Sequence, residues 1–235
     1  MLRFSALMLS LLFCCSVFAG ESWKGVPYDG DVSITVYAND EGIDVDVLTD
    51  DLLIRPANWN DFVDYVALFS DPEIARQERR EIWNAEQVFE QLRQWVWRWE
   101  EGADPFSAFT LYCWDNERWQ FAGYIALDHS QTKGESELKF AVLEEFRNRS
   151  YAKQALQAIV VEYAPFLSEL GYYANLNDPH VLAAPFRAIR AEVRADNPHA
   201  QAVLERTGFN HVGEEISSGV YTKRYRILVE DLIPE

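Results

Sequence analysis

The chain has 235 residues, and its 38 acidic residues against 21 basic ones give a formal net charge of −17 at pH 7. This length can bury one sizeable core without disulfides or a metal, and the acidity excludes binding of nucleic acids or anionic membranes through a generally basic surface. The four histidines lack the spacing of metal ligands, so the sequence predicts no metal site.

The first nineteen residues have the composition of a secretory signal peptide. Arg3 carries the only charge, residues 4–18 are almost wholly apolar, and Ala19 ends a run of small or modest side chains. The pattern predicts a leader over residues 1–19 that is cleaved after Ala19, and therefore an exported protein, periplasmic or secreted. Two alternatives stay open: an uncleaved N-terminal anchor, or a start codon assigned too early for a cytoplasmic protein. Once the leader is removed, Cys113 is the only cysteine, so no internal disulfide is expected.

Residues 20–51 form an N-terminal extension. Residues 32–37 and 43–48 alternate like strands around a turn, so a hairpin is expected. The extension contains no Lys or Arg between Asp29 and Asp51. Such a run is either a solvated face or a surface that attracts a cationic substrate, such as an amine, a polyamine or a basic peptide N-terminus. Its acidic residues are Asp29, Asp31, Asp40, Glu41, Asp44, Asp46, Asp50 and Asp51.

Strands and helices follow one another through the rest of the chain. The expected elements are a strand at 52–55, helices at 59–69 and 85–100, strands at 109–114, 119–127 and 138–142, a helix from 152, a strand at 191–194, a helix at 198–206 and a closing strand pair. Asn58 is a candidate cap for the first of these helices. The order predicts a mixed α/β fold in which helices pack on a central sheet.

The most informative run is residues 137–156. Leu138, Phe140 and Val142 alternate with other side chains, which is the period of a strand. From Ala152 the apolar positions change to a helical spacing, at Ala152, Leu156, Ile159, Val160 and Tyr163. A short polar turn with two arginines joins the two patterns. The N-terminus of a helix approached in this way is suited to binding an anion such as a pyrophosphate.

The turn also resembles a known signature. The run Arg147-Asn148-Arg149-Ser150-Tyr151-Ala152 is similar to the R-x-x-G-x-A motif of the GNAT N-acetyltransferases, a family in which this loop holds the pyrophosphate of acetyl-CoA. Ser150 stands where the family usually has glycine, which lets the backbone approach a phosphate closely. Serine keeps the N–H group and adds a hydroxyl donor but crowds the loop, so weakened or altered cofactor binding is expected.

Further blocks in the family's order resemble its Rim-type branch, which includes enzymes that acetylate the N-termini of ribosomal proteins. These blocks are residues 52–56 with 60–62 and 68–73, residues 121–127, residues 191–193 with 197–200, and residues 204–209. The resemblance implies a GNAT-like domain over residues 52–235. Its central sheet would be mostly antiparallel, twisted and flanked by helices, with the N-terminal hairpin as an addition. It also implies a homodimer as one open alternative, because pairing through sheet edges is common in the family.

The resemblance implies direct transfer of an acetyl group from acetyl-CoA to a primary amine, either a small cationic amine or a protein or peptide N-terminus. The strand before the turn would pair with the pantetheine arm, and the turn would hold the diphosphate. Each of these positions also has a simpler reading as a sheet residue or, for Asn197, as a helix cap. The residues implied in cofactor binding are Phe140, Ala141, Val142, Leu143, Arg147, Asn148, Arg149, Ser150, Tyr151, Ala152 and Asn197.

The acid and base of the reaction are less evident. Family members often place a Tyr at the position of Leu204 or a Ser at the position of Ala200, and both are missing here. Glu137, at the head of the motif strand, is the candidate general base, and Tyr151 in the loop is the candidate acid. The alternates are Asp128, His129 and His199.

Two other functions therefore stay open. One is a catalytically silent relative that binds an acyl-CoA, and the other is an exported protein that binds a basic partner. Export itself conflicts with the use of acetyl-CoA, which is a cytosolic metabolite. Delivery into another cell, an unused leader, or loss of the chemistry would each resolve that conflict.

Overall fold

The computed structural model describes residues 33–39, 42–102, 104–174, 182–217 and 219–233. The predicted leader, the acidic residues Asp29, Asp31, Asp40 and Glu41, and the loop at 175–181 lie outside these residues. In the described part of the chain, no helix is both long enough and apolar enough to cross a membrane.

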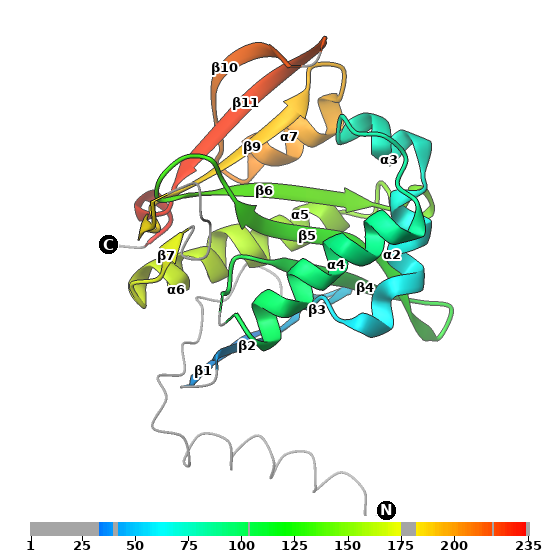
Figure 1. The fold of residues 1–235 in the computed structure, drawn as a ribbon, viewed down its shortest axis with the longest axis horizontal. Coiled ribbons are helices and arrows are strands. Elements are labelled where there is room, and N and C mark those ends of the chain that lie inside the picture. The colour runs from blue at the N-terminus through cyan, green and yellow to red at the C-terminus, as the bar shows by residue number, and fades with distance from the viewer. Residues whose placement is uncertain (1–32, 40–41, 103, 175–181, 218, 234–235) are drawn as a thin grey trace, which may run out of the picture.

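A nine-stranded sheet forms the centre of the fold, with the strand order β1-β2-β3-β4-β5-β6-β9-β11-β10 (Figure 1). Every neighbouring pair is antiparallel except β6 and β9, which run parallel. The mixed α/β fold with a mostly antiparallel sheet is therefore confirmed. The strands are β1 Ser33–Asn39, β2 Gly42–Leu48, β3 Leu52–Pro56, β4 Ala108–Asp115, β5 Arg118–His129, β6 Glu135–Val142, β9 Ala188–Arg194, β10 Asn210–Ser217 and β11 Val220–Leu228. A separate pair is formed by β7 Tyr173–Ala174 and β8 Ala184–Pro185.

The predicted N-terminal hairpin is confirmed as β1 and β2. It continues the main sheet, because Val47 and Leu48 of β2 pair with Ile54 and Leu53 of β3. Three strands, β3, β4 and β5, therefore separate β2 from β6.

Three helices pack on one face of the sheet: α2 Phe62–Phe69, α3 Pro72–Gln77 and α4 Ala85–Glu100. The side chain of Asn58 caps the short 3-10 turn η1 Trp59–Asp61 that leads into α2, as expected. Four buried rings, those of Tyr65, Phe69, Trp95 and Tyr124, have centroids 5.4 to 6.2 Å apart. Such pairs each add about 0.5–1.5 kcal/mol to the energy of burial.

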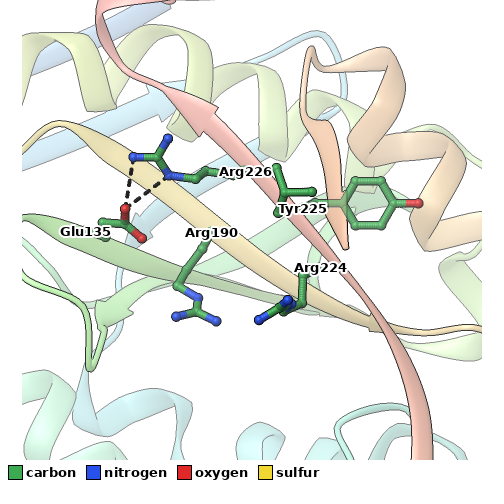
Figure 2. Close-up of a pocket in the computed structure, with 6 residues that line it drawn as sticks. Glu135, Arg190, Arg224, Tyr225 and Arg226 are labelled. Carbon is green, nitrogen blue, oxygen red and sulfur yellow. Dashed lines mark hydrogen bonds and ion pairs between the residues drawn. The ribbon is translucent and has the colours of Figure 1, made fainter. Parts of the chain in front are cut away.

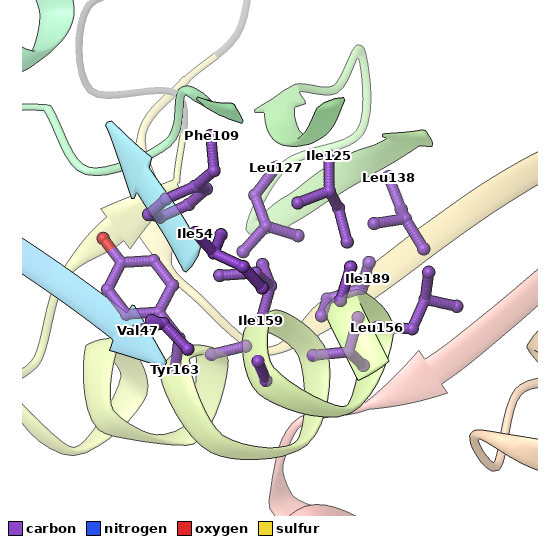
Figure 3. Packing of buried hydrophobic residues seen from close by; sticks show 14 of the residues in the cluster. Val47, Ile54, Phe109, Ile125, Leu127, Leu138, Leu156, Ile159, Tyr163 and Ile189 are labelled. Atoms are coloured by element: carbon purple, nitrogen blue, oxygen red, sulfur yellow. The ribbon is translucent and has the colours of Figure 1, made fainter. Parts of the chain in front are cut away.

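The opposite face is covered by a helical segment in three parts and by α7. The parts are α5 Tyr151–Leu156, the π-helical η3 Gln157–Tyr163 and α6 Ala164–Glu169, and α7 is Pro198–Arg206. The predicted apolar stripe is buried except at Ala152, which is partly exposed. Leu156, Ile159 and Tyr163 have no exposed area and pack against β-strand side chains such as Ile125 and Leu138 (Figure 3).

The middle of this segment is wider than the regular helix that the spacing suggests. The N–H of Ala164 bonds to the carbonyl of Ile159, five residues back. Pro165 follows immediately, and a proline inside a regular helix has no N–H to donate and clashes with the carbonyl four residues earlier. The wider turns ahead of Pro165 relieve that clash and keep the stripe facing the sheet.

Candidate functional site

The parallel strands β6 and β9 separate after a short contact. They pair only at Glu135 with Ala188, Ser136 with Ile189, and Glu137 with Arg190. Beyond these positions, residues 138–142 of β6 and 191–194 of β9 diverge, as the two arrows in Figure 1 show. We call this opening the β6–β9 fork. Among the described residues, β6 has a strand partner there on one side only, so the other backbone edge can receive an extended ligand.

Four of the residues predicted to bind the cofactor lie on this edge or directly after it. Phe140, Ala141, Val142 and Leu143 are each partly exposed. The pyrophosphate turn follows through η2 Glu144–Phe146 and leads into α5. The structure therefore brings the predicted strand and the predicted turn to the same end of the fork.

The turn has two residues in the left-handed backbone region. Asn148 has a φ of 62° and Ser150 a φ of 64°, a conformation that glycine adopts without strain. The position at which the motif usually has glycine thus keeps a glycine-like backbone here, at a cost of roughly 1–2 kcal/mol for a residue with a Cβ atom. The carbonyl of Ser150 accepts from the N–H of Gln154, and this is the first hydrogen bond of α5. The hydroxyl of Ser150 makes no capping bond. The first amides of α5 therefore face the turn.

The two arginines of the turn are held near it. The Nε of Arg147 donates to the carbonyl of Val142 at 3.1 Å, at the end of β6. Arg149 lies 3.6 Å from a carboxylate oxygen of Asp115, and its guanidinium is 5.5 Å from the centre of the Phe146 ring. Arg149 thus lies at the first residue of α5, where it adds positive charge to the helix dipole, whereas Arg147 lies at the end of β6.

Tyr151, the candidate acid, points elsewhere. It is 7% exposed and belongs to the core beneath the sheet, and its hydroxyl hydrogen-bonds to Cys113 of β4 and to Arg149. Burial raises the pKa of Tyr151 and outweighs the hydrogen bond from Arg149, which lowers it. The structure does not bring this hydroxyl to the fork.

Glu137, the candidate base, lies on the same sheet face as α2 and α4, which we call the acceptor face. Its carboxylate is 3.8 Å from Nζ of Lys139, and its side chain is 30% exposed. The neighbouring alternate, Asp128, is fully engaged: Arg98 and Lys139 contact its two oxygens at 2.5 and 3.1 Å. Burial acts to raise the pKa of Asp128, but these two cations hold it below its usual value. Glu137 is therefore the more available carboxylate.

The other alternates have simpler structural positions. His129 is 2.7 Å from the buried carboxylate of Asp104. His199 is exposed on α7. Asn197 caps α7, because its Oδ1 accepts from the N–H of Ala200 at 3.1 Å, so the capping alternative is confirmed.

Helix α3, which the sequence reading did not predict, lies across the acceptor side of the fork. Glu78, just after the helix, accepts from the hydroxyl of Tyr124 on β5 at 2.5 Å. Arg79 pairs with Glu192 on β9 at 2.7 Å, and Arg76 pairs with Asp196 beyond β9 at 2.9 Å. The helix thus joins both sides of the fork. The dipeptide at its start was the available signal: Asp71 caps it and Pro72 is its first residue.

Metal chemistry has no candidate site in the described part of the chain, where no cluster of three or more His, Cys, Asp or Glu side chains could hold an ion. The geometry instead suits an elongated ligand. Such a ligand needs amide groups along β6 and an anionic group at the turn.

The family model described as an acetyltransferase (GNAT) domain matches residues 51–210, more than half of the chain. No curated protein matches the chain.

Solved structures share the fold. An acetyltransferase of the GNAT family from Bacillus anthracis has a TM-score of 0.58 and 17% identity, covering 79% of this chain and 99% of its own. Spermidine N-acetyltransferase from Vibrio cholerae, in complex with CoA and spermine, has a TM-score of 0.57 and 16% identity, covering 77% and 97%. An acetyl transferase from Salmonella typhimurium that modifies the N-terminal serine of ribosomal protein L7/L12 has a TM-score of 0.56 and 13% identity, covering 76% and 95%. At these identities the likeness concerns the fold alone.

Proposed function

Because the chain belongs to the GNAT acetyltransferase family, we propose that it transfers an acetyl group from acetyl-CoA directly to a primary amine. The observation that carries this proposal is the β6–β9 fork, which opens after three paired positions. A turn with a glycine-like backbone at Ser150 then presents the start of a helix at the end of the fork. The free backbone edge of β6 thus leads directly to the anion site at the turn. A ligand with an amide-bearing arm attached to a diphosphate requires this order.

Acetyl-CoA supplies the acetyl group as an activated thioester. The residues present fit it: the free edge at 140–143 offers backbone donors and acceptors to its amides, and the turn at 147–152 offers helix amides and two guanidinium groups to its diphosphate. The Vibrio cholerae enzyme is a complex with CoA, which supports this choice of cofactor. Asn197 is left out of the cofactor set because its side chain is used by α7 and by Gln77.

Deprotonation of the amine is assigned to Glu137. A primary ammonium has a pKa of about 10.4, so most amine molecules are protonated at neutral pH and have to lose a proton before the nitrogen can attack. Glu137 is partly exposed on the acceptor face, and its 3.8 Å contact with Lys139 lies beyond close hydrogen-bond distance. Its oxygens can therefore accept a proton directly or through one water.

The leaving thiolate needs no acid from the usual positions. Leu204 has no exposed area, and Ala200 has no side-chain proton to give. An alkyl thiol has a pKa of about 8.5, so its anion is a stable leaving group near neutral pH and can take its proton from water. Loss of the usual acids is thus compatible with turnover.

The acceptor is proposed only as an amine. We assign the chain to the Rim-type branch on its sequence blocks, and the ribosomal-protein acetyltransferase among the structural neighbours supports this. A cationic acceptor was expected from the acidic segment, but Asp46 lies on β2, three strands from the fork, and Asp51 accepts from Gln154 at 2.8 Å. That charge is therefore not a reason to assign a cationic substrate.

Export and dimer formation remain separate proposals. Export rests on the leader over residues 1–19, and N-terminal sequencing of the protein from culture fractions tests it. A dimer would form at an outer strand, β1 or β10, and light scattering tests it.

The proposal is tested by calorimetric titration of acetyl-CoA, CoA and a longer acyl-CoA into the chain that starts at Gly20. Saturable binding of acetyl-CoA is expected, with a loss of about tenfold or more when Arg147 and Arg149 are both changed to Ala. Arg93→Ala is the control, because Arg93 lies on α4 with a single exposed partner. Absence of saturable binding at millimolar cofactor contradicts the proposal.

A catalytically silent relative is the second candidate, favoured by Leu204 and Ala200 at the usual acid positions. It predicts that acetyl-CoA binds and raises the melting temperature but that no amine in a panel is acetylated. Release of free CoA thiol with any one amine, lost in Glu137→Gln, supports the enzyme instead.

A further inference from the structure

A pocket lies on the acceptor face beside the closed end of the β6–β9 fork. Its volume is about 240 Å³, room for roughly eight waters. Figure 2 shows Arg190 and Arg224 pointing to the same side of the strands, while Arg226 pairs with Glu135. We call it the arginine pocket, and its lining residues are Glu135, Arg190, Val212, Arg224, Tyr225 and Arg226.

The strand register places this pocket next to the candidate base. Arg190 is the backbone partner of Glu137 across the β6–β9 contact, and it is also the partner of Arg226 on β11. Neighbouring strands lie about 4.8 Å apart, so the Cα atom of Arg226 is roughly 10 Å from that of Glu137. A molecule only a few bonds long can therefore reach from one to the other.

One of the carboxylates around the pocket is divided between two arginines. Glu192 is shared, since one oxygen contacts Arg79 at 2.7 Å and the other contacts Arg190 at 3.0 Å. Arg226 pairs with Glu135 at 2.9 Å. With the pair described next, each of the three arginines that line the pocket has one carboxylate partner, and Arg79, which lies outside the lining, competes for one of them.

Arg224 is the least satisfied of these arginines. Its Nη1 is 3.3 Å from an oxygen of Glu215, a pair in which both side chains are more than a third exposed. Its Nε is buried and has no hydrogen-bond partner within the described residues. A buried donor without a partner loses its hydration uncompensated, which costs about 1–3 kcal/mol. The exposed part of the Arg224 side chain, and not this Nε, is what an incoming ligand can meet.

We propose that the acceptor amine also carries a carboxylate or phosphate group, and that the arginine pocket binds this group while the amine lies at Glu137. This deepens the proposed function and rests on it for the role of the amine. Guanidinium groups match both anions with paired, charge-assisted hydrogen bonds. The chain as a whole carries −17, but charges farther away than about 8 Å are largely screened at physiological salt, so the arginines and their carboxylate partners set the local potential at the pocket.

The first test is calorimetric titration of inorganic phosphate, with excess CoA present to occupy the pyrophosphate turn. Arg224→Gln is the test variant, because its partner Glu215 stays hydrated, whereas loss of Arg226 would strand the buried Glu135. Arg93→Gln is the matched control, an exposed arginine with one carboxylate partner on α4. Phosphate is expected to bind about tenfold more weakly to Arg224→Gln and equally to the control. Equal affinity in all three proteins overturns the proposal.

The second test compares acceptors that differ in one group: ethanolamine with phosphoethanolamine, and propylamine with β-alanine. In each pair we expect a kcat/KM about tenfold higher for the anionic amine, and we expect Arg224→Gln to remove this preference. Equal kcat/KM within both pairs overturns the inference about the anionic group but does not contradict the proposed acetyltransferase activity. If no amine is acetylated but phosphate binding still depends on Arg224, anion binding at the arginine pocket is supported and the proposed acetyltransferase function is contradicted.

Discussion

The two halves of the sheet are built differently. From β3 to β5, helices cover both faces, and the buried carboxylate of Asp61 is enclosed by hydrogen-bond donors of the fold. From β9 to β10, α7 covers one face, and the second core, under α2 and α4, includes no described residue of these strands. The covered half stabilises the fold. The open half leaves charged side chains such as those of Arg224 and Glu215 partly exposed, so a ligand can reach them.

The largest expected effect is in the covered half. Asp61 has no exposed area and accepts from Arg55 at 2.5 Å, from Tyr112 at 2.6 Å and from Thr110 at 2.7 Å. Asp61→Ala leaves the cation and two hydroxyls without their acceptor, so the free energy of unfolding should fall by about 3–5 kcal/mol. Urea denaturation followed by tryptophan fluorescence measures it.

The matched change in the open half is Asp196→Ala. Asp196 also binds two arginines, Arg76 and Arg194, but its side chain is 54% exposed. Its removal should lower the free energy of unfolding far less than the loss of Asp61, because solvent screens an exposed ion pair. Equal losses for Asp61→Ala and Asp196→Ala would contradict the distinction between the two halves.

Asp128→Asn should produce the next largest effect, because it removes the charge that Arg98 and Lys139 share. We expect a loss of about 2 kcal/mol at pH 7. Since its folded pKa is held below the usual value, the carboxylate stabilises the native state above the unfolded pKa of about 3.9, and this is lost as pH falls through the folded pKa. The difference between the two proteins in urea should therefore shrink on acidification; a difference that stays constant would show that Asp128 is not the titrating group.

A smaller effect is expected at the contact between α3 and β9. Arg79 has a left-handed φ of 59° and pairs with Glu192 at 2.7 Å. Arg79→Gly and Arg79→Ala both remove the ion pair, but only glycine accepts that backbone without strain. We expect Arg79→Gly to be the more stable of the two by about 1 kcal/mol and both to show faster amide exchange in α3. Exchange in α3 that is unchanged in both variants would mean that the pair does not hold the helix.

Local signals predicted most of the elements. Asn197 followed by Pro198 marks the start of α7, and the predicted helix has the observed bounds. The alternation at Leu138, Phe140 and Val142 likewise gave β6. The widening of the helix ahead of Pro165 was missed, because apolar spacing reports which face is buried and not which carbonyl each N–H reaches.

The site was only partly predictable, for a similar reason. The turn at 147–152 is contiguous in sequence, so the position at which the motif usually has glycine could be identified, but its left-handed backbone is known only from the structure. The arginine pocket is not contiguous: Arg190 and Arg226 meet only because β11 inserts between β9 and β10. The direction of the Tyr151 hydroxyl toward Cys113 is likewise set by packing with β4.

The smallest effect is expected at the turn between β6 and α5, which lies where the two halves of the sheet meet. Ser150→Gly keeps the φ of 64° and removes the Cβ atom, so it should stabilise the native state by about 0.5–1 kcal/mol, less than the full strain because glycine also gives the unfolded chain more freedom. Acetyl-CoA should bind a few-fold more tightly, because the backbone can approach the diphosphate more closely. Ser150→Ala is the control: it loses the hydroxyl but keeps the strain. If alanine weakens binding and glycine does so equally, the hydroxyl itself is a cofactor ligand, and serine at this position is an adaptation of the loop and not a defect in it.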